Sequence, residues 1–317
     1  MNLLVTGATG FIGVRACAYF LEQGLRVRAA VRRPCERLDS RIEQHQIDAL
    51  GPQTDWSSAL TGIDAVVHLA SRVHVMRETA ADPLSEFRNI NVEGTRRLAQ
   101  MAAEAGVQRL VYLSTIKVNG EHTAAKAFRA DDPVAPQDPY GQSKWEAEQA
   151  LHEIGHQSDL ESVIIRPPLV YGAGVKGNLR QLMRIIRRGV PLPLAGIHNR
   201  RTLIGRDNLI SLIASCLQHP AAANQTFLAG DARPLSTPEL IRRIAQALDA
   251  SARLFPFPTT ALRTAAKLTG QGEAWKRLSD NLEIDLAPTR QRLNWTPPYG
   301  IEHDLHAMAS AFLDTRP

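Results

Sequence analysis

A tyrosine and a lysine, Tyr140 and Lys144, are spaced so that they could carry out proton transfer together. Asp138-Pro139-Tyr140 has the N-cap acid and the first-position proline that are typical of a helix start. Lys144 follows Tyr140 by four residues, so both side chains lie on one helix face. A tyrosine with an ordinary pKa of about 10 is a poor acid–base catalyst at neutral pH. A neighbouring ammonium is expected to lower that pKa, so the pair predicts a tyrosine that exchanges protons.

A glycine-rich turn near the start of the chain gives this pair a context. Gly7, Gly10 and Gly13, in the segment TGATGFIG, follow a short apolar run and precede a helical pattern. Glycines at such a place allow a pyrophosphate to approach the backbone N–H groups at a helix N-terminus. The spacing is one residue longer than the common dinucleotide fingerprint. We expect this turn to bind a nicotinamide dinucleotide; the alternative is a merely tight connection between strand and helix.

The end of the second predicted strand bears on which dinucleotide is bound. An acid there would bind the ribose 2′-hydroxyl of NAD, but the sequence reads Ala29-Ala30-Val31-Arg32-Arg33. Arg32 or Arg33 could instead pair with a 2′-phosphate, so we expect a preference for NADP(H), with NAD(H) as the alternative. The competing interpretation is that both arginines face water. Asp48, near the end of a weak third strand, could contact the adenine or be an ordinary loop acid.

The elements that must position these residues alternate along the first half of the chain. Apolar runs predict strands at 3–6, 27–31, 46–48, 65–70, 109–114 and 162–166. Helical patterns separate them at 11–23, at 89–105 and from about 139 onward. This alternation predicts an α/β fold, a doubly wound parallel (Rossmann) sheet.

The second half has a different character, with clustered prolines and helical patterns at 178–188, 207–218, 237–248 and 259–268. We expect residues 1–166 to form the dinucleotide-binding domain and residues 167–317 a smaller, mainly helical substrate domain. Some segments, such as 202–230, are expected to return to the first domain.

Composition restricts the class of protein. The 317 residues are 44% hydrophobic and 22% charged, and they include three cysteines, which favours a folded protein of a reducing compartment. No apolar run is long enough for a membrane span, so we expect a soluble, cytoplasmic protein. The histidines show no metal-ligand spacing, and His68 is interpreted as a structural strand histidine.

Basic residues are in excess, with a formal net charge of +5. Six arginines lie between Arg26 and Arg41, and eight basic residues with no acid lie between Lys176 and Arg206. Aromatic residues, 5% of the chain, do not alternate with these arginines, so the stacking platform of a nucleic-acid-binding protein is missing. A small anionic ligand explains the two stretches better.

Taken together, these motifs resemble one family. The glycine turn, Asn91 within NVEGT, Ser114-Thr115 at a strand end and Tyr140-Gly141-Gln142-Ser143-Lys144 are similar to those of the extended short-chain dehydrogenase/reductases, the NAD-dependent epimerase/dehydratase family. Within it, the chain most resembles the nucleotide-sugar 4-ketoreductases and UDP-sugar 4-epimerases of O-antigen biosynthesis. The resemblance covers essentially the whole chain.

The resemblance implies roles for particular residues. Tyr140 would exchange a proton with the sugar, Lys144 would hold the nicotinamide ribose, and Thr115, five residues before Gly120, would bind the reacting oxygen. The implied cofactor contacts are Gly7, Thr9, Gly10, Phe11, Ile12, Gly13, Arg32, Arg33, Asp48, Leu69, Ala70, Asn91, Ser114, Tyr140, Lys144 and Pro167. The implied substrate contacts are Ser114, Thr115, Lys117, Asn178 and Arg201, with Arg201 on the nucleotide diphosphate. A UDP-sugar substrate and a homodimer follow by analogy.

Departures from the family pattern favour one reaction over another. Val118 stands where many epimerases carry a tyrosine, Leu169 stands where many carry an asparagine, and the acid that favours NAD is absent. Ile116 and Lys117 replace the acid that a dehydratase needs. An epimerase retains its cofactor, whereas a reductase exchanges it and is suited to NADPH. We therefore expect reduction at carbon 4 of a UDP-4-keto-6-deoxy-N-acetylhexosamine. The alternatives are a UDP-glucose or UDP-N-acetylglucosamine 4-epimerase and a non-catalytic dinucleotide-binding protein.

Overall fold

Seven short strands pair in parallel into one sheet in the computed structural model, which describes residues 1–73 and 82–314. Their order across the sheet is β3-β2-β1-β4-β5-β6-β9. The strands are β1 (Asn2–Thr6), β2 (Arg26–Val31), β3 (Glu43–Gln46), β4 (Ala65–His68), β5 (Arg109–Leu113), β6 (Glu161–Arg166) and β9 (Thr226–Leu228). The four residues of β4 are all buried, as expected for a strand covered on both faces. The predicted doubly wound fold is confirmed.

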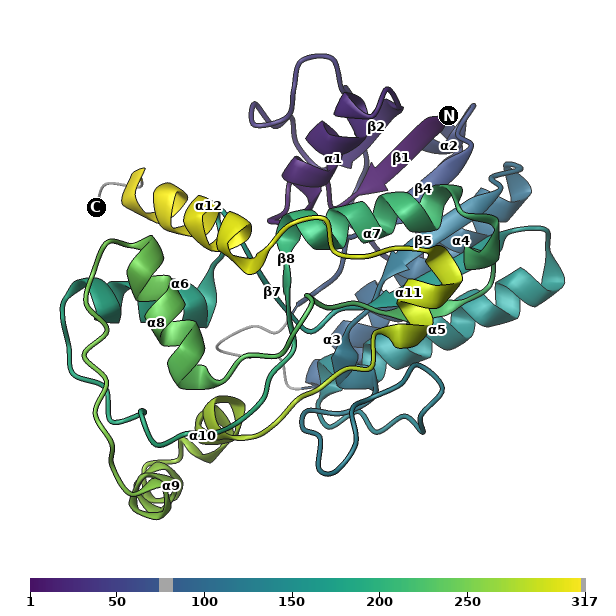
Figure 1. Ribbon diagram of the computed structural model, residues 1–317. Coiled ribbons are helices and arrows are strands. Elements are labelled where there is room, and N and C mark those ends of the chain that lie inside the picture. Colours follow the sequence, from purple (N-terminus) through teal and green to yellow (C-terminus); the bar gives the residue numbers. More distant parts are fainter. Residues whose placement is uncertain (74–81, 315–317) are drawn as a thin grey trace.

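Helices cover both faces of this sheet (Figure 1). On one face, α1 (Gly13–Glu22), α7 (Arg206–Gln218) and α11 (Ala287–Leu293) share a hydrophobic core with the strands. On the other face, α2 (Ser57–Leu60), α4 (Gly94–Glu104) and α5 (Pro139–Gln157) form a second core. The crossovers between parallel strands therefore bring the carboxyl ends of all the strands to one edge.

Smaller elements complete the part of the chain that carries the site. A short helix, α3 (Pro83–Phe87), runs into the π-helical segment η1 (Arg88–Glu93) and then into α4. The predicted helix at 89–105 is thus a π-helical turn followed by an α-helix. Single 3₁₀ turns lie at η2 (Ile116–Val118) and η3 (Pro220–Ala222). The third strand ends at Gln46 rather than at residue 48, so Asp48 lies beyond it and is exposed.

A second group of elements lies beside the sheet. Strands β7 (Leu169–Tyr171) and β8 (Leu203–Gly205) pair in parallel, and α6 (Gly177–Arg187), α8 (Thr237–Ala247) and α12 (Ile301–Asp314) pack around a core of their own. Helices α9 (Thr259–Leu268) and α10 (Gly272–Ser279) pack against each other at the lower left of Figure 1, away from the sheet. In the ranges 1–73 and 82–314, no helix is both long enough and apolar enough to span a bilayer. The division into two domains stays a prediction.

Candidate active site

A cavity of about 740 Å³ opens where the strands end. Its walls come from the segments that follow β1, β2, β4, β5 and β6, which is the edge where doubly wound sheets bind ligands. Thirteen of the predicted site residues line it: Gly7, Thr9, Gly10, Phe11, Ile12, Gly13, Arg32, Leu69, Ala70, Ser114, Thr115, Tyr140 and Pro167. The fold therefore brings the glycine turn and the predicted acid–base tyrosine into the same space.

The glycine turn is held by two close backbone approaches. Gly7 has φ of +67°, and a Cβ atom at this residue would lie 2.7 Å from the Ala70 nitrogen. A Cβ atom at Gly13 would lie 2.1 Å from the Gly7 carbonyl oxygen. Larger residues at these two positions would force the turn apart, so the sequence requirement is steric.

The same turn presents unsatisfied backbone donors to the cavity. The N–H groups of Phe11 and Ile12, just before α1, have no acceptor within residues 1–73 and 82–314. The N-terminal end of a helix attracts anions through such groups and through the helix dipole. A dinucleotide pyrophosphate therefore fits the residues that are present here.

Tyr140 enters the cavity from the first turn of α5. Asp138 caps that helix, its carboxylate accepting a hydrogen bond from the Gly141 nitrogen at 2.7 Å. The Lys117 ammonium lies 2.5 Å from the other Asp138 oxygen and 2.8 Å from Glu121. Lys117, a predicted substrate contact, is thus paired with two carboxylates and does not line the cavity.

The pKa of Tyr140 is raised, not lowered as the sequence predicted. Desolvation by burial raises it to about 12, a hydrogen bond with Ser71 opposes that rise, and the Asp138 charge adds to it. Lys144 is fully buried and does not line the cavity. Burial lowers the pKa of Lys144 to about 7, against the attraction of Glu148. The predicted lowering of the tyrosine pKa is therefore not found, because burial disfavours the charged phenolate by more than the Ser71 hydrogen bond favours it.

Ser114 lines the cavity and contacts a buried ion pair behind it. Its hydroxyl donates a short hydrogen bond to the carboxylate of Glu148, and Glu148 pairs with Arg166 at 2.6 Å. Arg166 also donates to the Asn119 side chain at 3.0 Å. No sequence motif indicated that Glu148 or Arg166 belongs to the site. The signal that could have found Glu148 is its place on α5, one further turn beyond Lys144.

Asn91 lies outside the cavity and acts as a brace. Its side chain exchanges hydrogen bonds with the backbone of Arg72, at 2.8 and 3.0 Å, and donates to the Ser143 hydroxyl at 3.0 Å. The Ser143 hydroxyl donates in turn to the Tyr140 carbonyl at 2.8 Å. Asn91 thus ties the segment after β4 to the first turns of α5, through the π-helical segment η1.

His68 is confirmed as a satisfied strand histidine. Its two ring nitrogens lie 2.6 Å from the Thr6 hydroxyl and 3.0 Å from the Thr95 hydroxyl. Burial, together with the nearby Lys144, lowers its pKa to about 3, so it stays neutral. His74, by contrast, lies outside the described residues.

Four other predicted contacts lie away from the cavity. Arg33 and Asp48 are exposed, and Asn178 is exposed near the start of α6. Arg201 is half-buried and donates to the Asp280 carbonyl at 3.0 Å. A second cavity, of about 550 Å³, lies between the segment 196–199 and helices α9 and α10, and Asp280 lines it. The basic residues Arg263, Lys267 and Lys276 line this second cavity, and they belong to no motif that the sequence analysis identified.

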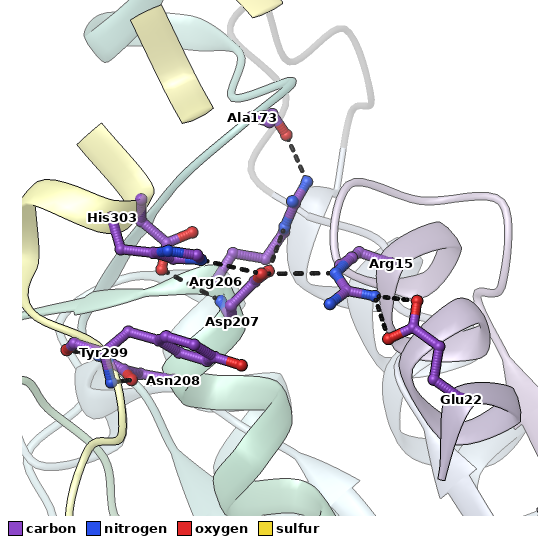
Figure 2. A network of polar contacts seen from close by, with 9 residues as sticks. Arg15, Glu22, Ala173, Arg206, Asp207, Asn208, Tyr299 and His303 are labelled. Carbon is purple, nitrogen blue, oxygen red and sulfur yellow. Dashed lines mark hydrogen bonds and ion pairs between the residues drawn. The ribbon is translucent and has the colours of Figure 1, made fainter. Parts of the chain in front are cut away.

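An ionic network holds the glycine turn against the smaller core. Figure 2 shows Asp207, on α7, between Arg15 of α1 and His303 of α12, with each contact at 3.4 Å. Burial raises the pKa of Asp207, but the charges of Arg206 and Arg15 outweigh this effect and lower it overall. Arg206 also lies over the ring of Phe11, which lines the cavity. The network therefore fixes one wall of the site.

Comparison with known proteins gives the same picture from independent evidence. Residues 3–230 match the family described as the NAD dependent epimerase/dehydratase family. A UDP-glucose 4-epimerase of Vibrio cholerae is 39% identical over 315 residues, 98% of this chain and 95% of the relative. An N-acetyl-α-D-glucosaminyl-diphospho-ditrans,octacis-undecaprenol 4-epimerase of Escherichia coli O157:H7 is 28% identical over 257 residues, 78% of this chain and 72% of the relative.

Solved structures agree on the fold. A UDP-glucuronic acid 4-epimerase from Bacillus cereus, in complex with NAD, superposes with a TM-score of 0.79 over 99% of both chains, at 20% identity. The protein MoeE5, in complex with UDP-glucuronic acid and NAD, superposes with a TM-score of 0.78 over 100% of both chains, at 22% identity.

Proposed function

The chain belongs to the NAD dependent epimerase/dehydratase family, and from this premise we propose that it is a UDP-sugar 4-epimerase dependent on NAD(P). The observation that carries the proposal is the cavity in which Tyr140, Ser114 and Thr115 meet the glycine turn. The 39% identity with a UDP-glucose 4-epimerase, over nearly the whole of both chains, selects carbon 4 of a UDP-sugar as the reacting centre. The sequence motifs favoured reduction at carbon 4 over epimerisation, and this proposal places epimerisation first.

Two side chains act on the sugar in this proposal, and a third acts on the cofactor. Tyr140 takes the proton of the carbon 4 hydroxyl and later returns it, while the Thr115 hydroxyl hydrogen-bonds the same oxygen. A nicotinamide dinucleotide held along the glycine turn would supply the reversible hydride transfer that no side chain of the protein can provide. We assign to Lys144, one turn after Tyr140, the roles of holding the ribose and of stabilising the phenolate when the lysine is protonated; it lies behind the cavity wall and does not line the cavity. The walls of the cavity orient the reactants and exclude water.

The direction of the Tyr140 pKa shift suits one of the two steps of the proposed acid–base role. With a pKa of about 12, Tyr140 is a protonated phenol at neutral pH, which suits the step that returns a proton to the sugar oxygen. The oxidation step requires the phenolate, which a positive charge nearby would stabilise. Lys144, with a pKa of about 7, can provide that charge when it is protonated. The two groups are thus coupled through the protonation of the lysine.

For the cofactor, we propose a preference for NADP(H). Arg32 lines the cavity just after β2, and this strand ends without an acid. A 2′-phosphate would accept charge-assisted hydrogen bonds from its guanidinium. Arg33 is exposed outside the cavity, so only Arg32 is assigned this role.

For the substrate, we propose that Arg201 binds the diphosphate. Its guanidinium is half-buried and forms no ion pair within residues 1–73 and 82–314, and burial lowers its pKa. A desolvated cation without a carboxylate partner is costly, and an anionic ligand would offset that cost. Asn178 and Lys117 are kept as proposed substrate contacts, although Lys117 would first have to leave Asp138 or Glu121.

A second candidate function rests on the absence of an acid after β2. A reductase uses an exchangeable NADPH once per turnover, and Arg32 suits that cofactor. The candidate reaction is the reduction at carbon 4 of a UDP-4-keto-6-deoxy-N-acetylhexosamine.

One assay separates the two functions. Purified protein is incubated with UDP-glucose or UDP-N-acetylglucosamine, and the sugars are resolved by NMR. Appearance of the 4-epimer without net cofactor consumption is the expected result. Oxidation of NADPH with the keto sugar alone, and no epimer, would transfer the assignment to the reductase. Dinucleotide binding with neither reaction would indicate a non-catalytic protein.

A further inference from the structure

Helices α9 and α10 form a projection with no buried side chain. Neither helix contains a buried residue, and no residue from 255 to 281 belongs to any of the hydrophobic cores. Figure 1 shows the pair hanging away from the sheet. Helices of ten and eight residues are too short to be stable by themselves, so their apolar side chains need a surface to rest on.

Large apolar side chains gather on this projection and on the strand-like segment that leads to it. Five of the nine large exposed apolar residues of the described chain lie here: Val190, Phe255, Phe257, Leu268 and Leu278. Leu268 is 84% exposed. Val190 belongs to the group because the segment after it pairs with the segment before Phe255, the Leu192 nitrogen donating to the Arg253 carbonyl at 2.8 Å. We call residues 187–190 and 251–279 together the α9–α10 surface.

The α9–α10 surface is also strongly basic. Its two segments contain seven basic residues, Arg187, Arg188, Arg253, Arg263, Lys267, Lys276 and Arg277, against one acid, Glu273. Glu273 pairs with Lys276, and the other six basic residues form no ion pair within residues 1–73 and 82–314. Arg263 and Lys267 line the 550 Å³ cavity, which leaves Arg187, Arg188, Arg253 and Arg277 as the exposed basic residues outside it. Arg187 and Arg188 belong to the acid-free stretch noted in the sequence, and they are exposed and do not line the proposed catalytic cavity.

The basic and apolar side chains of the α9–α10 surface together indicate what kind of partner it binds. Two copies of this surface facing each other would bring like charges together, which disfavours self-association through it. A face that carries Phe, Leu and unpaired Arg or Lys matches instead an anionic lipid surface, where the apolar groups enter the headgroup boundary and the basic groups meet the lipid phosphates.

We propose that the α9–α10 surface docks the protein on an anionic bilayer, as a peripheral contact and not as an inserted segment. The proposal rests on the exposed phenylalanines and leucines and on the arginines of the same segments, which form no ion pair within the part of the chain that the structure describes. It does not depend on the reaction catalysed in the cavity.

Co-sedimentation with lipid vesicles tests this proposal directly. Full-length protein is mixed with vesicles of phosphatidylcholine alone or with phosphatidylglycerol added. We expect binding to the anionic vesicles, weakening as salt is raised, and little binding to the neutral ones. Failure to sediment with anionic vesicles at low salt, or equal binding to both kinds of vesicle, overturns the proposal.

Variants show whether this surface is the one that binds. Phe255→Ser/Leu268→Ser removes apolar contact, and Arg187→Glu/Arg253→Glu reverses charge; each should weaken the partition coefficient about tenfold or more. Arg26→Glu/Arg292→Glu changes the net charge equally, at exposed positions outside the surface, and should have a much smaller effect. Equal losses in the surface and control charge variants would show general attraction by charge and overturn the assignment.

Two further measurements keep these outcomes interpretable. Circular dichroism melting checks that each variant is folded, and sedimentation velocity reports self-association without lipid. An oligomer of the wild-type protein that dissociates in Phe255→Ser/Leu268→Ser would show that a second copy covers this surface, which contradicts the proposal. Vesicle binding is measured without turnover, so the result is independent of whether the protein is an epimerase.

Discussion

The Nζ atom of Lys144 lies 4.0 Å from the ring centroid of Tyr112, over the face of a fully buried ring. This cation–π contact and the nearby Glu148 offset part of the cost of burying an ammonium. They do not offset all of it, because the pKa of Lys144 is lowered to about 7. The lysine that lies one turn after the proposed catalytic tyrosine is therefore close to changing its charge at physiological pH.

This shift predicts a pH-dependent stability. In the unfolded chain Lys144 has its ordinary pKa, so between pH 7 and about 10 the unfolded state binds more protons than the folded one. Raising the pH through this window therefore favours the folded state. The free energy of unfolding of the wild type, measured in urea, should rise by about 2 kcal/mol relative to Lys144→Met between pH 7 and pH 9.

Lys126→Met, at an exposed position, is the matched control and should show no such divergence. Parallel pH profiles for wild type and Lys144→Met would mean that the lysine keeps its charge in the folded protein.

Replacement of Tyr140 tests the acid–base assignment. Tyr140→Phe removes the hydroxyl that exchanges the proton, and turnover should fall by about 10²–10⁴-fold. Binding of the dinucleotide, followed by fluorescence titration, should change little, because the glycine turn is untouched. Full turnover in this variant would eliminate the proposed mechanism.

The cofactor preference is tested by two neighbouring arginines. Arg32→Ala should raise the Kd for NADP, measured by fluorescence titration, about tenfold or more over its effect on the Kd for NAD, since it removes charge-assisted hydrogen bonds to the 2′-phosphate. Arg33→Ala, which changes an exposed residue outside the cavity, should leave the ratio near that of the wild type. A protein that binds NAD as tightly as NADP, with or without Arg32, contradicts the preference.

The proposed diphosphate contact is also tested by comparing a variant of the assigned arginine with a variant of its neighbour. Arg201→Ala should weaken UDP binding by about 1.5–3 kcal/mol, measured by calorimetry. Arg200, its neighbour, is exposed and pairs with Glu283, so Arg200→Ala should have little effect. Equal affinities for UDP in the two variants would place the diphosphate elsewhere.

We expect the loss of one partner of the buried Arg166–Glu148 pair to lower the free energy of unfolding. Arg166→Met leaves a buried carboxylate without its cation and should lower the free energy of unfolding by about 3–5 kcal/mol. The double variant Arg166→Met/Glu148→Met removes both charges and should lose much less. Denaturant unfolding measures both, and a double variant as unstable as the single one would show that packing rather than charge sets the cost.

Much of the site could be predicted because it depends on local chain geometry. The glycine turn needs Gly7 and Gly13 for steric reasons, and the Asp138-Pro139 start of α5 is a local capping signal, so both were visible as short patterns. Lys117 and Asn91 were assigned to ligands by resemblance, yet one is paired with carboxylates and the other braces the backbone of Arg72. Such partners come from distant parts of the chain, and no local pattern specifies them. The homodimer and the cytoplasmic location stay predictions.

The sequence by itself determined the alternation of strands and helices, the turn before α1 and the one-turn spacing of Tyr140 and Lys144, because each is fixed by neighbours along the chain. The tertiary structure decided the pKa values of the buried side chains. The pKa of a buried group depends on its surroundings, and only folding buries Lys144 against the Tyr112 ring and pairs its helical neighbour Glu148 with Arg166. It also decided that residues 255–279 of the α9–α10 surface remain outside the hydrophobic cores of the described chain, which no hydrophobic pattern could reveal.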